Sequence, residues 1–432
     1  MNGPSLPRRT LLKSVGLGAL AAGTTACGSA KGPGARTGDK IVIGYVSPRT
    51  GSLAGFASGD GFVVDRVRAT AAYAKGFTVG GKTYEVEIVV KDTRSDPGRA
   101  SEVARELVLR DHADMILTSS APETTNPVAT VCEAQGIPCV STVVPWEAWY
   151  YSRQADPGNP KPFRYTTMFF FGVDQFGGCF VPMWERVSTN RVVGGMFPDD
   201  PDGNAFRAAY PAILDKAGYR WVDGGAYTDG TTAFGAMISK FRSEQCEIFI
   251  NAPLPPDFNA MWKHAAQRGF RPRLATVAKV LLFPADTVAL GGLVENIATD
   301  SWWGPYMPNA SSLDGETAKS LAESYQSASG RQWLQTLGSV YSLFEIAQKA
   351  FTSVDTPRDR KAVAAALQNL NYSGISGVLD FTRGPVPGVA IQQPVGVQWK
   401  KGIGRFPYEM VVVDNSLNPA VRIGADLIPT YP

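Results

Sequence analysis

Small polar residues end one of the buried β-runs of this sequence and lead into a helical segment. Ser119, Ser120 and Ala121 close the run 113–120 or follow it, and a helical pattern begins at Thr125. Loops after strands often carry binding sites, because the first backbone N–H groups of the next helix are free. These residues are therefore candidates for holding a ligand. The alternative is helix capping, which explains a Ser or Thr before a helix without any ligand.

Large aromatic residues gather in the segment STVVPWEAWYY at 141–151. Trp146 and Trp149 stand in it, followed by Tyr150. Trp and Tyr combine a large apolar area with one polar group, which suits the wall of a small-molecule pocket. The segment predicts either a bulky ligand stacked on these rings or a structural plug, in which Trp149 and Tyr150 pack the base of a helix.

Side chains that serve catalysis are sparse. The two histidines, His112 and His264, lie in or beside helical segments. The chain has no Gly-x-Ser-x-Gly, no Gly-x-x-x-x-Gly-Lys and no His-Glu-x-x-His sequence, so the hydrolase, nucleotide and zinc chemistries of these motifs have no support. We expect a binding protein rather than an enzyme, with no metal and no cofactor.

The cysteines leave one structural question open. Cys132 and Cys139 flank a turn at Gly136, and no Cys-x-x-Cys sequence occurs. A disulfide between these two cysteines would close a short loop and stabilise the fold by about 2–3 kcal/mol. Two buried free thiols explain the same pattern equally well.

The first 27 residues have the composition of an export signal. Arg8-Arg9 precede an uncharged run, 14–26, that is too short to remain as a membrane span. Paired arginines are typical of twin-arginine export, and the small residue before Cys27 resembles a lipobox, in which Cys27 carries a lipid anchor. The alternative is simple cleavage before an unmodified Cys27. Residues 28–39 are expected to form a flexible tether.

Net charge and length further limit the binding partners and the number of domains to be expected. The full chain has 42 basic and 39 acidic residues, a net charge of +3. The signal contains three of the basic residues and no acid, so the mature chain is close to neutral and has no field that favours nucleic acid or an acidic membrane surface. The length after the tether suggests two or three domains.

Strands and helices alternate in two consecutive sets. Buried β-runs separated by helical segments predict βαβ units and parallel sheets. The expected strands of the two sets lie at 40–47, 83–93, 113–120 and 136–141, and then at 163–170, 191–197, 246–252, 274–278 and 295–300. A helical stretch follows over 317–367, and the last strands are expected at 377–381, 394–399 and 408–414.

The opening strand and its loop, IVIGYVSPRTGSLAGFASGDGF, resemble type I periplasmic solute-binding proteins of the branched-chain amino-acid and amide group. Four further stretches agree with that family in the same order, over roughly 40–430. They are ILTSSAPETTNPVATVCEAQGIPCVS, FPDDPDGNAF, SVYSLFEIAQKAF, and SGISGVLDF with VGVQW.

The resemblance implies two Rossmann-like α/β lobes joined by three crossovers, with the ligand in the cleft at the carboxyl ends of the strands. We place the crossovers near residues 164, 299 and 385. The N-terminal lobe would then hold 40–163 and 300–384, and the C-terminal lobe 164–299 and 385–432.

The resemblance to this family also implies ligand contacts in the first lobe. Phe56 matches the aromatic residue of the first cleft loop, although a loop aromatic can instead pack the lobes together. A hydroxyl and backbone amides at 119–121 would hold the ligand's carboxylate. Val144 and Trp146 stand where relatives have a Gly-Ala-Thr-like run that contacts an amino acid. The larger residues here favour a bulkier ligand.

In the second lobe, Asp202 and Lys279 fall where the family contacts its ligand. Amino-acid binders have an acidic residue near the position of Lys279, so a lysine there favours a carboxylate or another anion, and Asp202 becomes the candidate for an amine. Both also have ordinary explanations, a solvated turn and a solubilising lysine. Trp302 and Trp303 fall at the second crossover and either border the cleft or stiffen the hinge.

The function that the resemblance implies is that of a monomeric solute receptor for an ABC importer. It would close on an amino acid, an amide or, as we favour, a bulky or aromatic carboxylate, and deliver it to a membrane permease with its ATPase. The alternative is a sensor of the same fold that feeds a signalling partner. Genes for a permease and an ATPase beside this one would favour the importer, and a kinase gene would favour the sensor.

Overall fold

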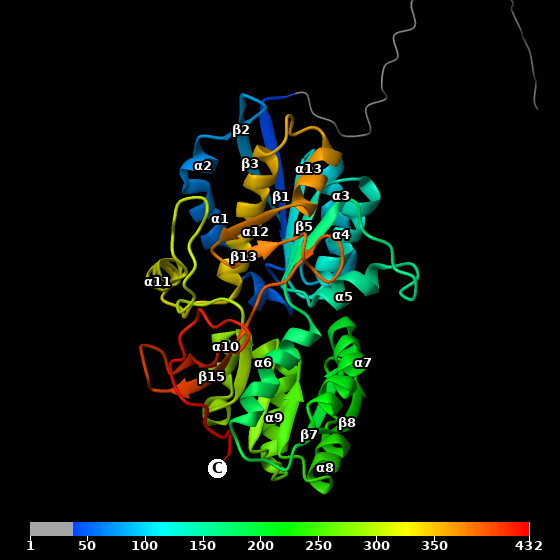
Figure 1. The fold of residues 1–432 in the computed structure, drawn as a ribbon, viewed down its shortest axis with the longest axis vertical. Coiled ribbons are helices and arrows are strands. Elements are labelled where there is room, and N and C mark those ends of the chain that lie inside the picture. Colours follow the sequence, from blue (N-terminus) through cyan, green and yellow to red (C-terminus); the bar gives the residue numbers. More distant parts are fainter. Residues whose placement is uncertain (1–37, 432) are drawn as a thin grey trace, which may run out of the picture.

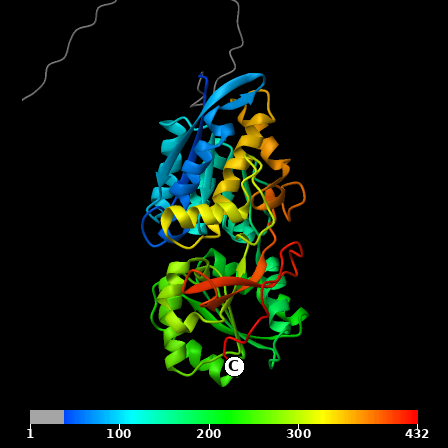
Figure 2. The ribbon, with the colours of Figure 1, turned by 90° about the vertical axis from the view of Figure 1, so that its left-hand side faces the viewer.

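The computed structural model describes residues 38–431. The export signal, Cys27 and most of the expected tether lie outside these described residues. The described chain forms two α/β lobes stacked along the long axis of the molecule, each built around a seven-stranded sheet (Figures 1 and 2). The predicted fold class, two Rossmann-like lobes, is confirmed.

The sheet of the first lobe has the strand order β14-β6-β5-β4-β1-β3-β2, and only the β2–β3 pairing is antiparallel. Its central strands are buried along almost their whole length because helices cover both faces. The strands are β1 (Lys40–Ser47), β2 (Phe77–Val79), β3 (Lys82–Asp92), β4 (Met115–Ser119), β5 (Cys139–Thr142), β6 (Thr166–Phe169) and β14 (Val389–Ala390). The helices are α1 (Asp60–Ala69), α2 (Ala71–Ala74), α3 (Pro97–Leu109), α4 (Pro122–Gln135), α5 (Trp146–Tyr150), α11 (Ala318–Ser329), α12 (Thr336–Thr352) and α13 (Arg360–Gln368), with short 3-10 turns η1 (Ala54–Ala57) and η2 (Tyr151–Arg153). A hairpin of β12 (Asn371–Gly374) and β13 (Gly377–Asp380) completes this lobe.

The sheet of the second lobe has the order β16-β15-β11-β10-β9-β7-β8. Its core is parallel, and β15 and β16 add an antiparallel edge. The strands are β7 (Val192–Pro198), β8 (Arg220–Tyr227), β9 (Ile248–Asn251), β10 (Leu274–Val277), β11 (Ala298–Ser301), β15 (Val395–Lys401) and β16 (Tyr408–Asp414). The helices are α6 (Val173–Glu185), α7 (Pro201–Lys216), α8 (Gly235–Ser243), α9 (Pro255–Gln267) and α10 (Pro284–Ala289), with η3 (Val280–Leu282) and η4 (Gly291–Val294).

The chain passes between the lobes three times, a few residues later than expected. Strand β6 pairs with β5 and with β14 in the first sheet, whereas β11 pairs with β10 and β15 in the second. The crossings therefore follow Phe169, Ser301 and Ala390, rather than residues 164, 299 and 385. The reason is that each strand completes its own sheet before the chain leaves the lobe.

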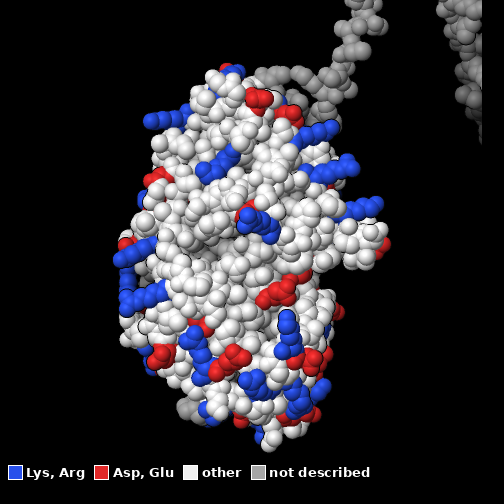
Figure 3. Space-filling model, viewed as in Figure 1, with Lys and Arg blue, Asp and Glu red and all other residues white. Residues whose placement is uncertain are grey.

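Charged side chains of both signs are scattered over the face of the molecule in Figure 3, with broad uncharged areas between them. The four described cysteines, Cys132, Cys139, Cys179 and Cys246, are free and buried. Of the two alternatives for Cys132 and Cys139, the structure has the pair of free thiols rather than the disulfide. The helix that contains Cys132 is capped by Gly136, which takes the left-handed conformation with φ 63° and donates its N–H to the carbonyl of Cys132.

A glycine in α12 makes room for a buried tryptophan at the second crossover. A Cβ atom at Gly338 would overlap the indole ring of Trp303. Trp303 is fully buried and donates from Nε1 to the carbonyl of Ile375 at 3.2 Å. Because Trp302 precedes it directly, the position of Trp303 also fixes where Trp302 lies.

We expect Gly338→Ala to lower the free energy of unfolding by about 1–3 kcal/mol, because the added methyl group forces the Trp303 ring out of its packed position. Gly61→Ala is the matched control, since Gly61 also lies in a helix and a Cβ there meets no atom within 4 Å. That change should stabilise by about 0.5–1 kcal/mol through helix propensity. Denaturant unfolding of both variants checks the pair, and equal effects would contradict the packing explanation.

Candidate functional site

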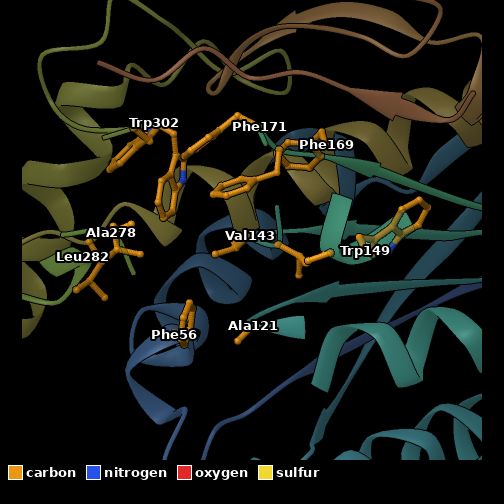
Figure 4. Close-up of a cluster of buried hydrophobic side chains, with 14 of the residues drawn as sticks. Phe56, Ala121, Val143, Trp149, Phe169, Phe171, Ala278, Leu282 and Trp302 are labelled. Carbon is orange, nitrogen blue, oxygen red and sulfur yellow. The ribbon is translucent and has the colours of Figure 1, made fainter. Parts of the chain in front are cut away.

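A cavity lies between the two lobes, at the carboxyl ends of both sheets. Its empty volume, counted together with the open solvent at its mouth, is about 390 Å³. Its wall combines aromatic and small apolar residues, of which Figure 4 labels Phe56, Ala121, Val143, Ala278, Leu282 and Trp302, with three charged side chains. The lining residues are Phe56, Ala121, Val143, Pro145, Phe170, Phe176, Asp202, Phe206, Ala252, Ala278, Lys279, Leu282, Asp300 and Trp302.

Loops at the ends of β1, β4 and β5 form the wall on the side of the first lobe. Phe56 comes from η1 after β1, Ala121 immediately precedes α4, and Val143 and Pro145 follow β5. Phe56 and Ala121 therefore lie in the cavity wall, where the sequence placed them. Ser119 and Ser120 are buried beside Ala121, are not part of the wall, and have no hydrogen-bond partner for their hydroxyls among residues 38–431.

Val143 rather than Val144 faces the cavity. Val143 has φ 63°, which is rare for a β-branched residue and strains the backbone. This local reversal turns the Val143 side chain toward the cavity and leaves Val144 fully buried in the first lobe. The resemblance pointed to Val144, and in the structure its neighbour Val143 lines the cavity.

The two tryptophans of α5 do not line the cavity. Trp146 is half-buried, with its ring 5.8 Å from that of Tyr151. Trp149 is fully buried, 5.3 Å from the Phe163 ring and stacked under Arg153. Figure 4 shows Trp149 well to one side of Val143, with Trp302, Ala278 and Leu282 on the other. Trp149 thus matches the structural alternative raised by the sequence, since it packs the base of a helix.

Lys279 forms the charged centre of the opposite wall. Its ammonium nitrogen lies 2.9 Å from Oδ2 of Asp202, 3.1 Å from Oδ2 of Asp200 and 3.9 Å from Oε1 of Glu123. Asp200 and Asp202 begin α7 in the same lobe as Lys279, whereas Glu123 comes from the first turn of α4 in the other lobe. The charge of one buried lysine is therefore shared among three carboxylates.

This cluster changes the electrostatic expectation for the site. Burial alone would lower the pKa of Lys279, but Asp202, Glu123 and Asp200 together raise it well above its usual value. Burial raises the pKa of Asp202, and the negative charges of Asp200 and Glu123 raise it further. The positive charge of Lys279 lowers it, but by less. Lys279 is thus a charged lysine already neutralised by protein groups, and its selection of an anionic ligand, inferred from the sequence, has no support in this geometry.

The backbone at Lys279 is strained. The residue has φ 65° and ψ −72°, and the N–H of Val280 donates to the carbonyl of Ala278 at 2.8 Å. This is a γ-turn with positive φ, the rare form of that turn. Val143 and Lys279 thus place one strained residue in each lobe, both in the cavity wall, and such strain clusters at ligand-binding sites.

Asp300 is a wall residue that the sequence reasoning missed. It is the third residue of β11, at the second crossover, and is 1% exposed. Burial raises the pKa of Asp300 to about 7, against hydrogen bonds from its own backbone N–H and from Thr299. Its position at the carboxyl end of the predicted strand 295–300 is the signal by which the sequence could have identified it.

Aromatic rings complete the wall at the hinge. The ring of Trp302 lies 4.8 Å from that of Phe170, and Phe176 lies 4.9 Å from Phe206. The indole N–H of Trp302 donates to Ser339 at 2.9 Å, which leaves the ring to face the cavity without a free donor. Trp302 thus borders the cavity, and Trp303 stays in the core of the first lobe.

We expect Lys279→Met to lower the free energy of unfolding by about 3–5 kcal/mol at pH 7.5, because Asp200 and Asp202 lose their buried counter-charge. The loss should shrink at pH 5, because the pKa of Asp202 is raised by burial and its carboxylate then takes up a proton. Lys319→Met is the control, since Lys319 is 70% exposed in its pair with Glu323 and should change stability by less than about 0.5 kcal/mol. Denaturant unfolding at both pH values measures this, and a Lys279 variant as stable as the control would contradict the cluster's role.

Several solute-binding proteins resemble this chain in sequence or in structure. The chain is 24% identical over 258 residues to an amino acid binding protein of Pseudomonas aeruginosa, a match that covers 58% of this chain and 64% of that protein, just under two thirds of its length. The leucine binding protein LivK of Thermotoga maritima superposes with a TM-score of 0.69 at 18% identity, covering 86% of this chain and 98% of that one.

A third similar protein is an ABC-transporter solute binding protein of Rhodopseudomonas palustris in complex with 3,4-dihydroxybenzoic acid. Its TM-score is 0.67 at 15% identity, covering 90% of this chain and 98% of that one. At such identities the two superpositions show a shared fold. Residues 40–402, most of the chain, match the family of periplasmic binding proteins. The chain therefore belongs to the periplasmic binding protein family.

Proposed function

We propose that this protein is the extracytoplasmic solute-binding component of an ABC importer, and that its two lobes close on one small organic solute. The observation that carries the proposal is the cavity itself, whose wall comes from both lobes and from the hinge. Membership of the periplasmic binding protein family supports the same function, with binding rather than catalysis as the task of the site.

Direct contacts between the lobes hold the closed arrangement. The rings of Phe56 in the first lobe and Phe283 in the second meet edge to face at 4.8 Å. Glu123 reaches Lys279 across the same boundary at 3.9 Å. A solute favours closure only if it binds the closed form better than the open one, and residues that line the cavity from both sides provide that difference.

A third contact between the lobes lies at the first crossover. Oε1 of Glu147 in α5 accepts a hydrogen bond from the backbone N–H of Val173, the first residue of α6, at 2.9 Å. A Cβ atom at Gly172 would overlap both Trp146 and Glu147. Glycine at this position thus allows the two lobes to approach.

The lining supports a solute with an apolar or aromatic body, which includes the amino acids, amides and bulky carboxylates expected from the sequence. No side chain caps the N-terminus of α4 at Ala121 in the described chain. Because Pro122 has no N–H and Thr124 and Thr125 donate to the carbonyl of Ala121, the N–H of Glu123 is the first-turn donor left for a solute carboxylate. The LivK and Rhodopseudomonas palustris proteins, described as binding leucine and holding 3,4-dihydroxybenzoic acid, are compatible with this range.

The proposal includes export through the twin-arginine signal, a lipid on Cys27, and delivery of the solute to a permease and its ATPase by a monomer. Within residues 38–431, no helix is long and apolar enough to cross a membrane.

We expect a thermal-shift screen of residues 28–432 against amino acids, amides and aromatic carboxylates to find a stabilising solute, by about 2.7 kcal/mol at a hundred times its Kd. Phe56→Ala should weaken that solute at least about tenfold, because it removes both a wall residue and a contact between the lobes. Tyr151→Ala, an aromatic truncation outside the cavity, should leave Kd unchanged. Equal losses in both variants would place binding elsewhere.

We also expect the full-length chain, expressed in a bacterium with twin-arginine export, to fractionate with membranes. Cys27→Ser should move it to the soluble extracytoplasmic fraction, because the lipid attachment point is gone. Cys132→Ser should stay with the membrane. Retention of the Cys27→Ser protein at the membrane would rule out a lipid anchor at that residue.

A further inference from the structure

The cavity wall contains two buried carboxylate oxygens that accept no hydrogen bond within the described residues. Oδ2 of Asp300 has no hydrogen-bond partner in the described part of the chain, and the other donors to this carboxyl are its own backbone N–H and the Thr299 hydroxyl, which lies 3.4 Å from Oδ1. Oδ1 of Asp202 is also without a partner among the described residues. A buried carboxylate without a donor is costly, so two such groups in one cavity wall point to a missing donor.

The protein itself does not provide that donor. The Lys279 ammonium lies against Oδ2 of Asp202 and makes no ion pair with Asp300 in the region that the structure describes. The indole N–H of Trp302 is used by Ser339. The groups that influence Asp300 from its other neighbours are Cys179 on α6, Tyr210 on α7 and Tyr306 after β11, and none of them is a cation.

The rest of the wall also favours positive charge. Phe170, Phe176, Phe206 and Trp302 line the cavity together with the two aspartates. Aromatic faces carry negative potential and attract cations, the more strongly where water is excluded. Apolar rings beside unpaired carboxylates form a setting for an organic cation, not for an anion.

On these grounds we propose that the solute carries a protonated amine or another cationic nitrogen, held by Asp300 and Asp202 against the rings at the hinge. This inference rests on the proposed solute-binding function and specifies its ligand class. The cationic nitrogen is then the group that the cavity selects, and a carboxylate on the solute is optional. This preference for a cation replaces the preference for an anion that the sequence analysis inferred from Lys279.

The pH dependence of binding follows from the same geometry. The pKa of Asp300 is raised to about 7 by burial, so the free protein must release a proton to pair with a cation. Affinity for an amine should therefore rise as pH increases from 5.5 to 8. Asp202, with its raised pKa, acts in the same direction, whereas Lys279, Cys179, Tyr210 and Tyr306 have pKa values raised beyond this range.

The test uses two matched sets of probes with residues 28–432, measured by calorimetry at pH 5.5, 7 and 8. The aromatic set is 2-phenylethylamine, phenylalanine and 3-phenylpropanoate, and the aliphatic set is 3-methylbutylamine, leucine and 4-methylpentanoate. In at least one set the amine and the amino acid should bind, more tightly at pH 8 than at pH 5.5. The carboxylate of that set should bind about a hundredfold more weakly.

Asp300→Asn should weaken the amine about a hundredfold and remove most of its pH dependence. Asp60→Asn is the matched control, because Asp60 is another buried carboxyl, with its pKa raised by burial to about 6, but lies outside the cavity wall. Circular dichroism and unfolding curves establish that both variants are folded. The control should leave the Kd of the amine unchanged.

Three results would overturn the inference and leave the proposed function intact. They are equal binding of the carboxylate-only probes, an unchanged Kd in Asp300→Asn, and affinity that falls as pH rises, which would mean that Asp300 acts as a protonated donor. If none of the six probes binds, the hits of the wider screen decide, since a hit without a cationic nitrogen overturns the inference and one with it supports it. No hit in either screen would count against the proposed function itself.

Discussion

The buried ammonium group of Lys279 sets the electrostatic character of the interface between the lobes. It lies between two carboxylates of its own lobe and approaches a third, Glu123, from the other lobe. Without it, the start of α7 would carry two uncompensated charges in a place without water. With it, Asp202 is anchored through one oxygen and keeps the other free. The position of α7, the charge of the cavity and part of the contact between the lobes therefore depend on one side chain in a strained turn.

Much of the fold follows from local pattern. Apolar β-runs separated by helices were enough to predict two parallel sheets, since each run is buried on both faces. Strand β8 was not predicted, because Asp223, Gly224 and Gly225 interrupt its apolar pattern. The exact crossing points were also missed, since whether a strand end pairs in one lobe or the other depends on contacts between distant segments, such as β6 with β14.

The site was only partly predictable, for physical reasons that differ between residues. Phe56, Ala121, Asp202 and Lys279 lie in the cavity wall because they follow strand ends, a position that sequence spacing reveals. The role of Lys279 was not visible, because its partners are 77 and 79 residues away in the chain and one more lies in the other lobe. For Trp146 and Trp149 the sequence left a pocket wall and a structural plug open, since residue type alone does not tell a ring in a wall from a ring in a core.

A hydrogen bond between Glu147 and Val173 joins the two lobes at the first crossover. Helix α6 begins at Val173 in one lobe, while the carboxylate that accepts from its first N–H comes from α5 in the other. The free N–H groups at a helix start need acceptors, and water replaces a lost side-chain acceptor only in part. If the lobes part, the motion either carries Glu147 and Val173 together as a pivot or leaves the first N–H of α6 to water. This one hydrogen bond therefore distinguishes two kinds of hinge.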